Sequence, residues 1–398
     1  MLLSTQAMTL RGQSPELSAI EADEAARAKS PPSLPVVAPA EIVAVPELLV
    51  EVDRLAVQGI AEKRMPGCVI AAGYRGQLFF LRAYGNSAVK PMTRPMTTTT
   101  VFDLASITKP VATATSMMHL WERGYFRLSD RVATYIPEFA ANGKEEITIR
   151  QLFTHTSGLI PDNSIRDYAD GKTIALQKIY DLPLRAQPDE KFMYSDVGFI
   201  VLGDLVERLS GLDVHEYSQK YIFGPAGMME TGYLPPQILQ SRAAVTEQRD
   251  GRWIQGEVHD PRSFAMGGIA GHAGLFSTAN DLAIYAQMMI QGGRIGGNQI
   301  LSPTTITKMG RAIPIPGAIR SLGWDKQSRY SSNRAETLTP DAFGHGGFTG
   351  TVLWIDPRLE LFYIFLSNRV HPDGNGSVNQ LAGRIGNVIV SAVGAVAR

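Results

Sequence analysis

The sequence predicts an α+β fold in which strands from both ends of the chain form one antiparallel sheet around a helical middle. Two short β-type runs occur early, at residues 68–74 and 77–82, and two more occur late, at 350–357 and 360–368. The segment between them, from residue 107 to about 290, has mainly helical character. The helical segment is therefore expected to be an insertion between the two halves of the sheet.

The first 46 residues are predicted to be a flexible tail and linker. They end in a stretch with prolines at 31, 32, 35, 39 and 46, a density that favours extended backbone and removes hydrogen-bond donors. From residue 47 the chain is expected to form one folded unit. Its α/β part is predicted to comprise about 47–110 and 291–398, and its helical part about 111–290.

Local patterns support each element of that unit. Apolar residues at helical spacing predict a helix over 48–63, and Arg75-Gly76 joins the first two β-type runs as a hairpin. A second hairpin is predicted around 356–359, where Asp-Pro-Arg-Leu separates the two late runs. The remaining clear helical patterns lie at 110–123, 198–209 before Ser210-Gly211, and 378–396.

Composition excludes several classes of protein. The 398 residues are 44% apolar and 19% charged, which excludes a wholly disordered chain. Lys+Arg and Asp+Glu both total 38, so there is no basic excess for binding nucleic acid. A single cysteine, Cys68, cannot form an internal disulfide, and its apolar surroundings predict a buried, unreactive thiol.

Membrane and export signals are absent from the sequence pattern. No run approaches the roughly 18 to 20 apolar residues of a transmembrane helix. Residues 1–10 have no cationic region before their short apolar pieces, so we expect a cytoplasmic rather than a periplasmic protein. A trimmed or misassigned start would leave export open.

Several familiar catalytic signatures are missing. There is no G-x-S-x-G, and His215-Glu216 lacks the second histidine of a zinc protease motif. The glycine-rich segment 344–350 is not followed by the Lys-Ser/Thr of a phosphate-binding loop. We expect no metal and no organic cofactor.

The segment 103–110, DLASITKP, contains a candidate nucleophile. If a helix starts here, Ser106 and Lys109 share one face. A serine hydroxyl needs a base to remove its proton, and a buried amine can supply one when burial favours its neutral form. The positive end of the helix would also stabilise a developing oxyanion. Taken alone, S-x-x-K is common, and Ser106 could equally be a helix N-cap.

Two further segments favour the catalytic interpretation. Residues 188–196, PDEKFMYSD, place Tyr194 before an apolar helix, and 344–350, GHGGFTG, place His345 before a glycine pair. In this order S-x-x-K, Y-S-D and H-G-G resemble the β-lactamase-related, penicillin-recognising serine hydrolases. This family includes class C β-lactamases, D-alanyl-D-alanine carboxypeptidases, D-aminopeptidases and family VIII carboxylesterases. The resemblance covers about residues 48–395 and includes 102–110, 147–159, 268–283 and 344–357.

The resemblance implies a β-lactamase/transpeptidase-like fold with the active site in a cleft between the sheet and the helical part. It also implies that Ser106 attacks the substrate carbonyl and forms an acyl-enzyme, while Lys109 helps to deprotonate the serine. Tyr194 would be the general base, as a phenolate or by sharing protons with Lys109. A phenol titrates near about 10, so this role needs cationic neighbours.

The H-G-G segment is expected to bind the substrate. The backbone amides of Ser106 and Phe348 would form the oxyanion hole, and His345 would orient the substrate or the Tyr194 proton. Gly346 and Gly347 would let the substrate lie close to the strand edge.

One departure from the family pattern bears on the substrate. Many peptidase and lactamase relatives have Tyr-x-Asn, whereas here the third residue is Asp196. An amide can donate to a substrate carbonyl, but an ionised carboxylate only accepts, and Asp196 could instead pair with Lys109. Ester cleavage, with its better leaving group, would suffer less from this change than amide or β-lactam cleavage.

Other polar residues are expected to be structural. His155, Thr156 and His272 are predicted to hold loops by hydrogen bonds. The pair His259-Asp260 could line the cleft mouth or form a surface turn, and Trp324-Asp325 is predicted to edge the active site.

The leading hypothesis is an acyl-enzyme hydrolase of small acyl esters with weak or no β-lactamase activity. The first alternative is a penicillin-binding D-alanyl-D-alanine carboxypeptidase or a D-amino-acid amidase, which H-G-G favours. The second is a non-catalytic binding module on the same fold. The expected partner is therefore a small ester, amide or peptide, and the oligomeric state is left open by the sequence.

Overall fold

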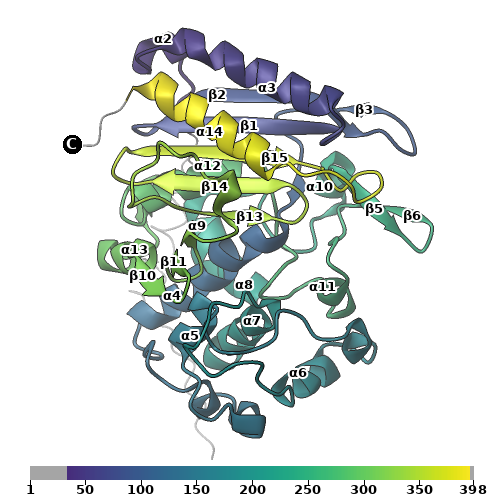
Figure 1. Ribbon diagram of the computed structural model, residues 1–398, viewed down its shortest axis with the longest axis vertical. Coiled ribbons are helices and arrows are strands. Elements are labelled where there is room, and N and C mark those ends of the chain that lie inside the picture. Colours follow the sequence, from purple (N-terminus) through teal and green to yellow (C-terminus); the bar gives the residue numbers. More distant parts are fainter. Residues whose placement is uncertain (1–33, 395–398) are drawn as a thin grey trace, which may run out of the picture.

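The computed structural model describes residues 34–394 (Figure 1). Its largest feature is an antiparallel sheet of nine strands in the order β10-β11-β12-β13-β14-β15-β1-β2-β3. The strands are β1 (Gly67–Tyr74), β2 (Gln77–Ala88), β3 (Arg94–Pro95), β10 (Ile313–Ile315), β11 (Ala318–Arg320), β12 (Asp325–Gln327), β13 (Phe343–Gly347), β14 (Thr351–Asp356) and β15 (Leu361–Ser367). β1 pairs with β15, from Cys68 opposite Ser367 to Tyr74 opposite Leu361. The prediction that both chain ends build one sheet is confirmed.

Helices cover both faces of this sheet, which explains the unbroken apolar run in β1. Successive side chains of a strand point to opposite faces. Cys68 and Ile70 pack in the core under α3 (Val50–Ala61) and α14 (Asn379–Val393), whereas Val69 and Ala71 pack in the core that includes α12 (Ala279–Ile290). Figure 1 shows α3 and α14 side by side along one face.

The helical part lies below the sheet in Figure 1. Its helices and the neighbouring ones are α4 (Thr115–Glu122), α5 (Ile149–Thr154), α6 (Lys172–Tyr180), α7 (Asp196–Ser210), α8 (Val214–Ser218), α9 (Gly224–Ala226), α10 (Gln237–Arg242), α11 (Pro261–Ala265) and α13 (Pro303–Gly310). Single turns and π-type turns are η1 (Pro46–Leu49), η2 (Ala105–Ile107), η3 (Lys109–Ala114), η4 (Val132–Thr134), η5 (Pro137–Gly143), η6 (Ile165–Tyr168), η7 (Gln219–Phe223) and η8 (Ser331–Asn333). Small two-stranded sheets pair β4 (Phe102–Asp103) with β7 (Phe276–Ser277), β5 (Val245–Arg249) with β6 (Arg252–Gln255), and β8 (Arg294–Ile295) with β9 (Asn298–Gln299). α7 ends where the sequence predicts, at Gly211 with a left-handed φ of 76°.

Two predicted boundaries differ from the structure. The expected linker includes α2 (Pro39–Ile42) and a bridge from Val36 to Leu78, so its described part is attached to β2. The rest of the expected tail, residues 1–33, lies outside the described residues. α12 falls within the predicted helical part but packs on β1, β14 and β15, because its apolar face completes the core beneath the sheet.

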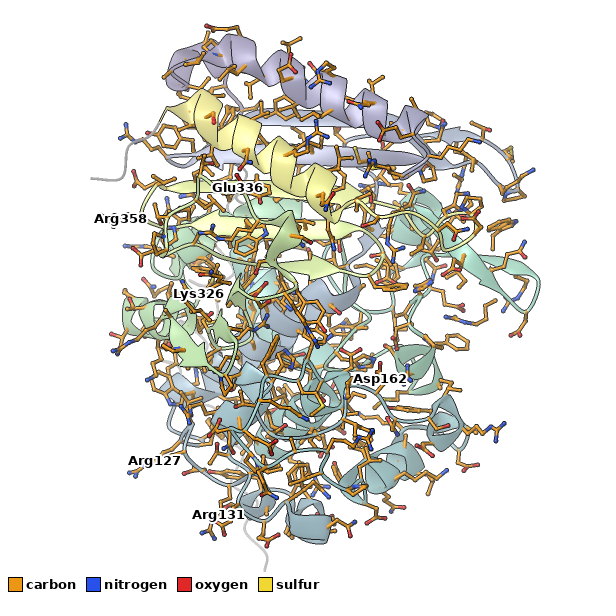
Figure 2. All side chains as sticks on the ribbon, viewed as in Figure 1. Arg127, Arg131, Asp162, Lys326, Glu336 and Arg358 are labelled. Atoms are coloured by element: carbon orange, nitrogen blue, oxygen red, sulfur yellow. The ribbon has the colours of Figure 1, made fainter. Side chains whose placement is uncertain are left out.

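Charged side chains are placed as their solvation requires. Figure 2 shows Arg127 and Arg131 on the outside of the helical part, whereas Lys326 is buried at the sheet edge. Nζ of Lys326 donates to the carbonyls of Gly310 and Asp341 at 3.0 and 2.9 Å, and burial lowers the pKa of this amine to about 8. Among the described helices, none has the length and apolarity needed to cross a bilayer.

Cys68 is buried in β1, as predicted. Burial raises the pKa of its thiol, which disfavours the reactive thiolate.

Candidate active site

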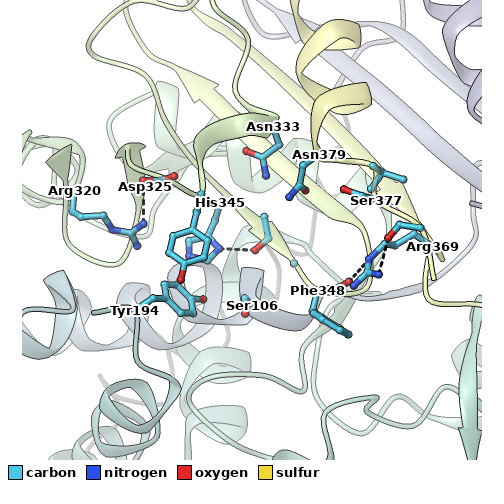
Figure 3. Close-up of a pocket in the computed structure, with 15 residues that line it drawn as sticks. Ser106, Tyr194, Arg320, Asp325, Asn333, His345, Phe348, Arg369, Ser377 and Asn379 are labelled. Carbon is cyan, nitrogen blue, oxygen red and sulfur yellow. Dashed lines mark hydrogen bonds and ion pairs between the residues drawn. The ribbon is translucent and has the colours of Figure 1, made fainter. Parts of the chain in front are cut away.

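A cavity of about 360 Å³ opens beside η2, at the end of β13 (Figure 3). It brings together most of the residues that the motifs single out. The residues lining it are Ser106, Tyr194, Arg320, Asp325, Tyr330, Asn333, His345, Gly346, Gly347, Phe348, Arg369, Gly376, Ser377, Val378 and Asn379. Lys109 and Asp196 lie directly behind Ser106 and Tyr194 rather than in the wall of the cavity.

Ser106 lies in η2, and the backbone before it is tightly held. Asp103 is buried, and its Oδ1 accepts the Ala105 N–H at 2.8 Å while its Oδ2 accepts the His259 N–H at 2.6 Å. Ala105 adopts a left-handed φ of 47°, a conformation that is costly for a residue with a Cβ. The Ser106 side chain makes no capping bond, so the N-cap alternative is not realised. Instead, its Oγ accepts a hydrogen bond from Lys109 Nζ at 2.9 Å.

Lys109 is completely buried, and its amine has two hydrogen-bond acceptors and one carboxylate partner. Besides Ser106 Oγ, Nζ contacts Asp196 Oδ1 at 2.6 Å and the His272 carbonyl at 3.0 Å. Burial acts to lower the pKa of Lys109, but the Asp196 carboxylate and Tyr194 act against it, and the net shift is upward. The amine is therefore an ammonium, and the pairing of Asp196 with Lys109 that the sequence suggested is present.

Tyr194 immediately precedes α7, whose N-cap is Ser195. Interactions of its hydroxyl with Ser106 and Lys109 both act to lower its pKa. Burial raises the pKa of Tyr194, and the neighbouring Lys109 ammonium only partly offsets this effect. The resting side chain is therefore a neutral phenol poised between the serine and the lysine.

The glycine pair of β13 is required by the protein itself. A Cβ on Gly347 would lie 2.3 Å from the Leu104 carbonyl oxygen and 2.2 Å from Thr351 Oγ1. The reason is a close approach between η2 and β13, in which Thr351 Oγ1 donates to the Leu104 carbonyl at 3.0 Å. A Cβ on Gly346 would meet Asn333 Nδ2 at 2.4 Å. Gly347 thus allows the serine segment and the strand to approach each other, and Gly346 leaves room for Asn333, in addition to any substrate.

Phe348 follows this pair, and its carbonyl accepts a hydrogen bond from Arg369 Nε at 2.7 Å. The Arg369 guanidinium also lies 4.4 Å from the Phe348 ring centroid, and the ring itself is 60% exposed. These contacts hold the backbone at the position predicted to complete the oxyanion hole.

His345 is buried beside Tyr194, with 6.0 Å between the ring centroids. Its Nδ1 is 2.8 Å from the Gly346 carbonyl, so this nitrogen carries the proton and donates it. Burial, Arg320 and Lys109 all hold the pKa of His345 well below its usual range. The imidazole is neutral, so it can donate or accept a hydrogen bond without adding charge to the site.

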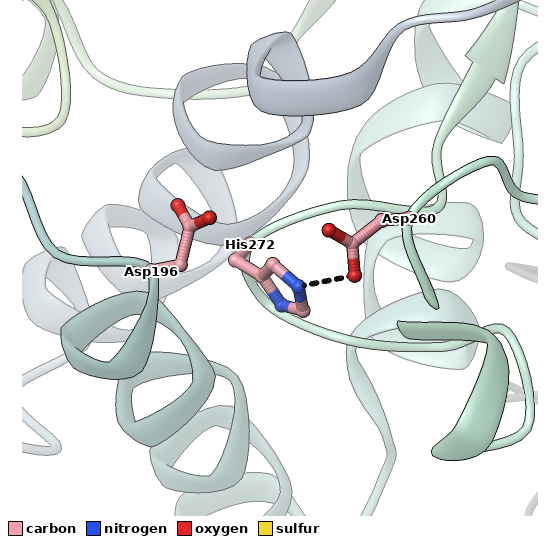
Figure 4. A group of neighbouring side chains, drawn as sticks. All are labelled: Asp196, Asp260 and His272. Carbon is pink, nitrogen blue, oxygen red and sulfur yellow. Dashed lines mark hydrogen bonds and ion pairs between the residues drawn. The ribbon is translucent and has the colours of Figure 1, made fainter. Parts of the chain in front are cut away.

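Asp196, Asp260 and His272 form a compact polar group behind the serine (Figure 4). His272 Nε2 lies 2.9 Å from Asp260 Oδ1, which also accepts the Ser263 N–H at 2.8 Å. Burial acts to raise the pKa of Asp260, but His272 and the hydrogen bonds lower it more strongly. The three side chains are close enough to share a cation. Of this group, the Lys109 ammonium contacts the Asp196 carboxylate and the His272 carbonyl.

The remaining histidines hold loops as predicted. His155 Nδ1 accepts the Ser195 N–H at 3.1 Å, and the Thr156 hydroxyl donates to Asp189 at 2.7 Å. For His259 the structure favours the cleft mouth over a surface turn, because its ring stacks on Phe348 with 5.7 Å between centroids.

The segment 311–340 contributes residues that sequence reasoning missed. Arg320, Tyr330 and Asn333 line the cavity, and their only local signal is the neighbouring Trp324-Asp325. Asp325 also lines the cavity, but the prediction for Trp324 is wrong. Its ring is completely buried against Tyr285 and Phe343, since so large an apolar surface is stabilised more by the core.

The fold and the Ser106–Lys109–Tyr194 arrangement define the class of active-serine hydrolases with an S-x-x-K motif. Comparison with known proteins supports this assignment and identifies the family within this class. The family model described as Beta-lactamase matches residues 52–386, so the chain belongs to the β-lactamase family.

Individual relatives differ in activity. A protein of Salmonella agona, provisionally named D-alanyl-D-alanine carboxypeptidase, is 32% identical over 338 residues, covering 75% of this chain and 74% of the relative. EstCE1, a hydrolase with promiscuous acyltransferase activity, superposes with a TM-score of 0.69 at 22% identity, covering 87% of this chain and 98% of EstCE1. A class C β-lactamase gives a TM-score of 0.70 at 18% identity, covering 87% and 97%. These two likenesses establish the shared fold.

Proposed function

We propose that this β-lactamase-family hydrolase cleaves small acyl esters through an acyl-enzyme on Ser106. Ser106 Oγ attacks the ester carbonyl carbon, and its proton passes to the oxygen of Tyr194, which accepts it in the phenolate form. The backbone amides of Ser106 and Phe348 stabilise the oxyanion. When the carbonyl re-forms, the bond to the alkoxy group breaks and Tyr194 returns the proton to that leaving group. Water then repeats the sequence on the acyl-enzyme and releases the acid.

Lys109 acts in this mechanism as a fixed positive charge. Nζ donates to Ser106 Oγ and to the His272 carbonyl and lies 2.6 Å from the Asp196 carboxylate, and its raised pKa keeps it an ammonium, which has no lone pair to accept a proton. The ammonium instead stabilises the negative oxygen of either Ser106 or Tyr194. The base role therefore belongs to Tyr194.

The observation that carries the choice of esters is the 2.6 Å contact between Asp196 and Lys109. A carboxylate in this position accepts hydrogen bonds only, so it offers no donor to the carbonyl of a substrate amide. Amides and β-lactams lose that contact. Esters depend less on it because an alkoxide leaves more readily than an amide nitrogen.

Hydrolysis of p-nitrophenyl butyrate by the wild type and by Ser106→Ala tests the proposal. We expect turnover by the wild type, a butyryl adduct on Ser106 in the intact mass, and loss of both in the variant. Activity that survives in Ser106→Ala would refute the assignment of the nucleophile. If no ester or peptide were turned over and none left an adduct, the result would favour the binding-module alternative.

A second candidate is hydrolysis of D-alanyl peptides. The Arg320 guanidinium lines the cavity and is fully buried, and its Nε and Nη2 have no hydrogen-bond partner among the described residues. Asp325 lies 3.1 Å from Nη1, but the other donors suit a planar carboxylate such as a peptide C-terminus. The provisional name of the Salmonella relative agrees with this candidate. Release of D-alanine from a D-alanyl-D-alanine peptide, faster than p-nitrophenyl butyrate turnover, would favour it over the esterase.

A further inference from the structure

One residue, His155, holds the backbone on both sides of Tyr194. Its carbonyl accepts the Met193 N–H at 2.9 Å, and its Nδ1 accepts the Ser195 N–H at 3.1 Å. The backbone N–H groups of the residues immediately before and after the tyrosine thus both donate to the same residue. The sequence separation is about 40 residues, so this contact is tertiary and joins the end of α5 to the start of α7.

The imidazole also packs on the tyrosine itself. The ring centroids of His155 and Tyr194 are 4.4 Å apart and the rings are tilted by 30°, a stacked arrangement. His155 is 1% exposed, and Phe199 contacts its ring at 5.2 Å between centroids. Tyr194 therefore rests on a ring that is itself fixed in the core.

The protonation state of His155 follows from its hydrogen bond. Because the Ser195 N–H donates to Nδ1, that nitrogen is unprotonated and the neutral ring carries its hydrogen on Nε2. Burial, Arg320 and Lys109 keep the pKa of His155 well below its usual range. The acceptor is thus retained at any pH at which the protein would be assayed.

His155 also adopts a conformation that serves this contact. It is the C-cap of α5, with a left-handed φ of 58°. This region is unfavourable for most residues with a Cβ. The strain turns the chain so that one residue presents its carbonyl and its side chain to the same neighbouring segment.

From this geometry we infer that His155 is a positioning residue for Tyr194, directing its hydroxyl towards Ser106 and Lys109. The inference rests on the proposed function, in which Tyr194 is the general base. The hydroxyl is at the far end of a long side chain, so a small rotation of the backbone or ring displaces it substantially. Misplacement of a catalytic group by about 1 Å can cost about a hundredfold in rate.

Two substitutions separate the contribution of the His155 ring from that of its side-chain hydrogen-bond acceptor. His155→Asn retains tolerance of left-handed φ and offers an amide oxygen close to the position of Nδ1, but it removes the ring. His155→Gly retains the backbone conformation and removes both the side-chain acceptor and the ring. We expect kcat for p-nitrophenyl butyrate to fall about tenfold in His155→Asn and about a hundredfold in His155→Gly. KM should change by less than about twofold, since His155 does not line the cavity.

His119→Asn is the matched control. His119 is also buried and packs on a tyrosine, with 5.4 Å between the ring centroids of His119 and Tyr221, and its Nδ1 lies 2.7 Å from the Tyr217 hydroxyl. This pair lies outside the cavity lining. We expect His119→Asn to lower the melting temperature as much as His155→Asn while keeping kcat within about twofold of the wild type.

All rates are to be divided by the concentration of sites titrated with a fluorophosphonate that labels Ser106. The positioning role is supported if kcat per labelled site falls in both His155 variants and falls less in His155→Asn than in His155→Gly. Unchanged kcat per labelled site in both His155 variants, or an equal fall in His119→Asn, overturns it, because either result means that only folding was affected. If the wild type shows no Ser106-dependent hydrolysis, the proposed function fails and the inference fails with it.

Discussion

Replacing Asp196 by asparagine changes the charge beside Lys109 with little change of shape. In the wild type the carboxylate oxygen lies 2.6 Å from Nζ, Lys109 is fully buried and the Asp196 side chain is 20% exposed. At an effective dielectric constant of about 20, the direct attraction at this distance is about 6 kcal/mol, most of which offsets desolvation. An amide oxygen would still accept the ammonium hydrogen. The expected loss of unfolding free energy is therefore only about 1–3 kcal/mol.

The same substitution is expected to change substrate preference. Asparagine adds an amide N–H that can donate to a substrate carbonyl, and such a neutral hydrogen bond contributes about 1–1.5 kcal/mol. This corresponds to roughly a fivefold to tenfold faster acylation by a penicillin, since 1.36 kcal/mol is a factor of ten. Ester hydrolysis should stay within about threefold of the wild type, because the ester does not rely on that donor.

The assay compares two second-order rate constants for each variant. One is the rate of penicilloyl adduct formation followed by intact mass, and the other is kcat/KM for p-nitrophenyl butyrate. Asp260→Asn is the control, because it removes a neighbouring carboxylate that contacts His272 rather than Lys109. A lactam-to-ester ratio that does not rise in folded Asp196→Asn, or that rises equally in Asp260→Asn, would refute the reasoning.

Three further predictions concern packing and titration. Gly347→Ala should lower both the melting temperature and kcat, since its Cβ would lie 2.3 Å from the Leu104 carbonyl oxygen. Calorimetry and ester kinetics measure the two effects, and wild-type values of both would contradict this prediction. Burial raises the pKa of Asp281 from its usual 3.8 to about 6, so the folded state binds the extra proton and stability falls as pH rises between about 4 and 6. In urea titrations Asp281→Asn should be less sensitive to pH over that window than the wild type, and parallel curves would contradict this. Because the pKa of Tyr194 is raised, kcat/KM for esters should increase with pH across 6–9, by up to about tenfold per unit, whereas a flat profile would exclude a tyrosine base.

The fold was predictable where burial acts on both sides of a strand. β1, β14 and β15 carry apolar runs of the expected length, whereas β2 extends to Ala88, six residues beyond the predicted run; the hairpin turns between them have clear signals. The packing of α12 on the sheet was not predictable, because helical periodicity reports that one face is buried, not which element buries it. The attachment of Val36 to Leu78 was missed for a similar reason, since a single backbone bridge has no side-chain pattern.

The candidate catalytic residues were predictable because short motifs carry them. Ser106, Tyr194 and His345 each stand in a recognisable triplet, and the structure places all three around one cavity. Arg320 was not predictable. It reaches the cavity through the short strands β11 and β12, whose pairing includes a register shift between Ile319 and Arg320. Pairing over three residues with an irregularity leaves no periodic signal in the sequence.

The hydrogen bonds of Lys109 decide how the site divides its chemical roles. The Lys109 ammonium donates to Ser106 and to the His272 carbonyl, and the Asp196 carboxylate lies 2.6 Å from Nζ as its counter-charge. A neutral amine in this position would present its lone pair to one of these oxygens, which is repulsive. The surroundings therefore stabilise the charged form at the expense of basicity. With Lys109 held as an ammonium, the Tyr194 oxygen is the proposed acceptor of the Ser106 proton, and the position of that oxygen becomes critical. The contacts of His155 on both sides of Tyr194 are consistent with this requirement.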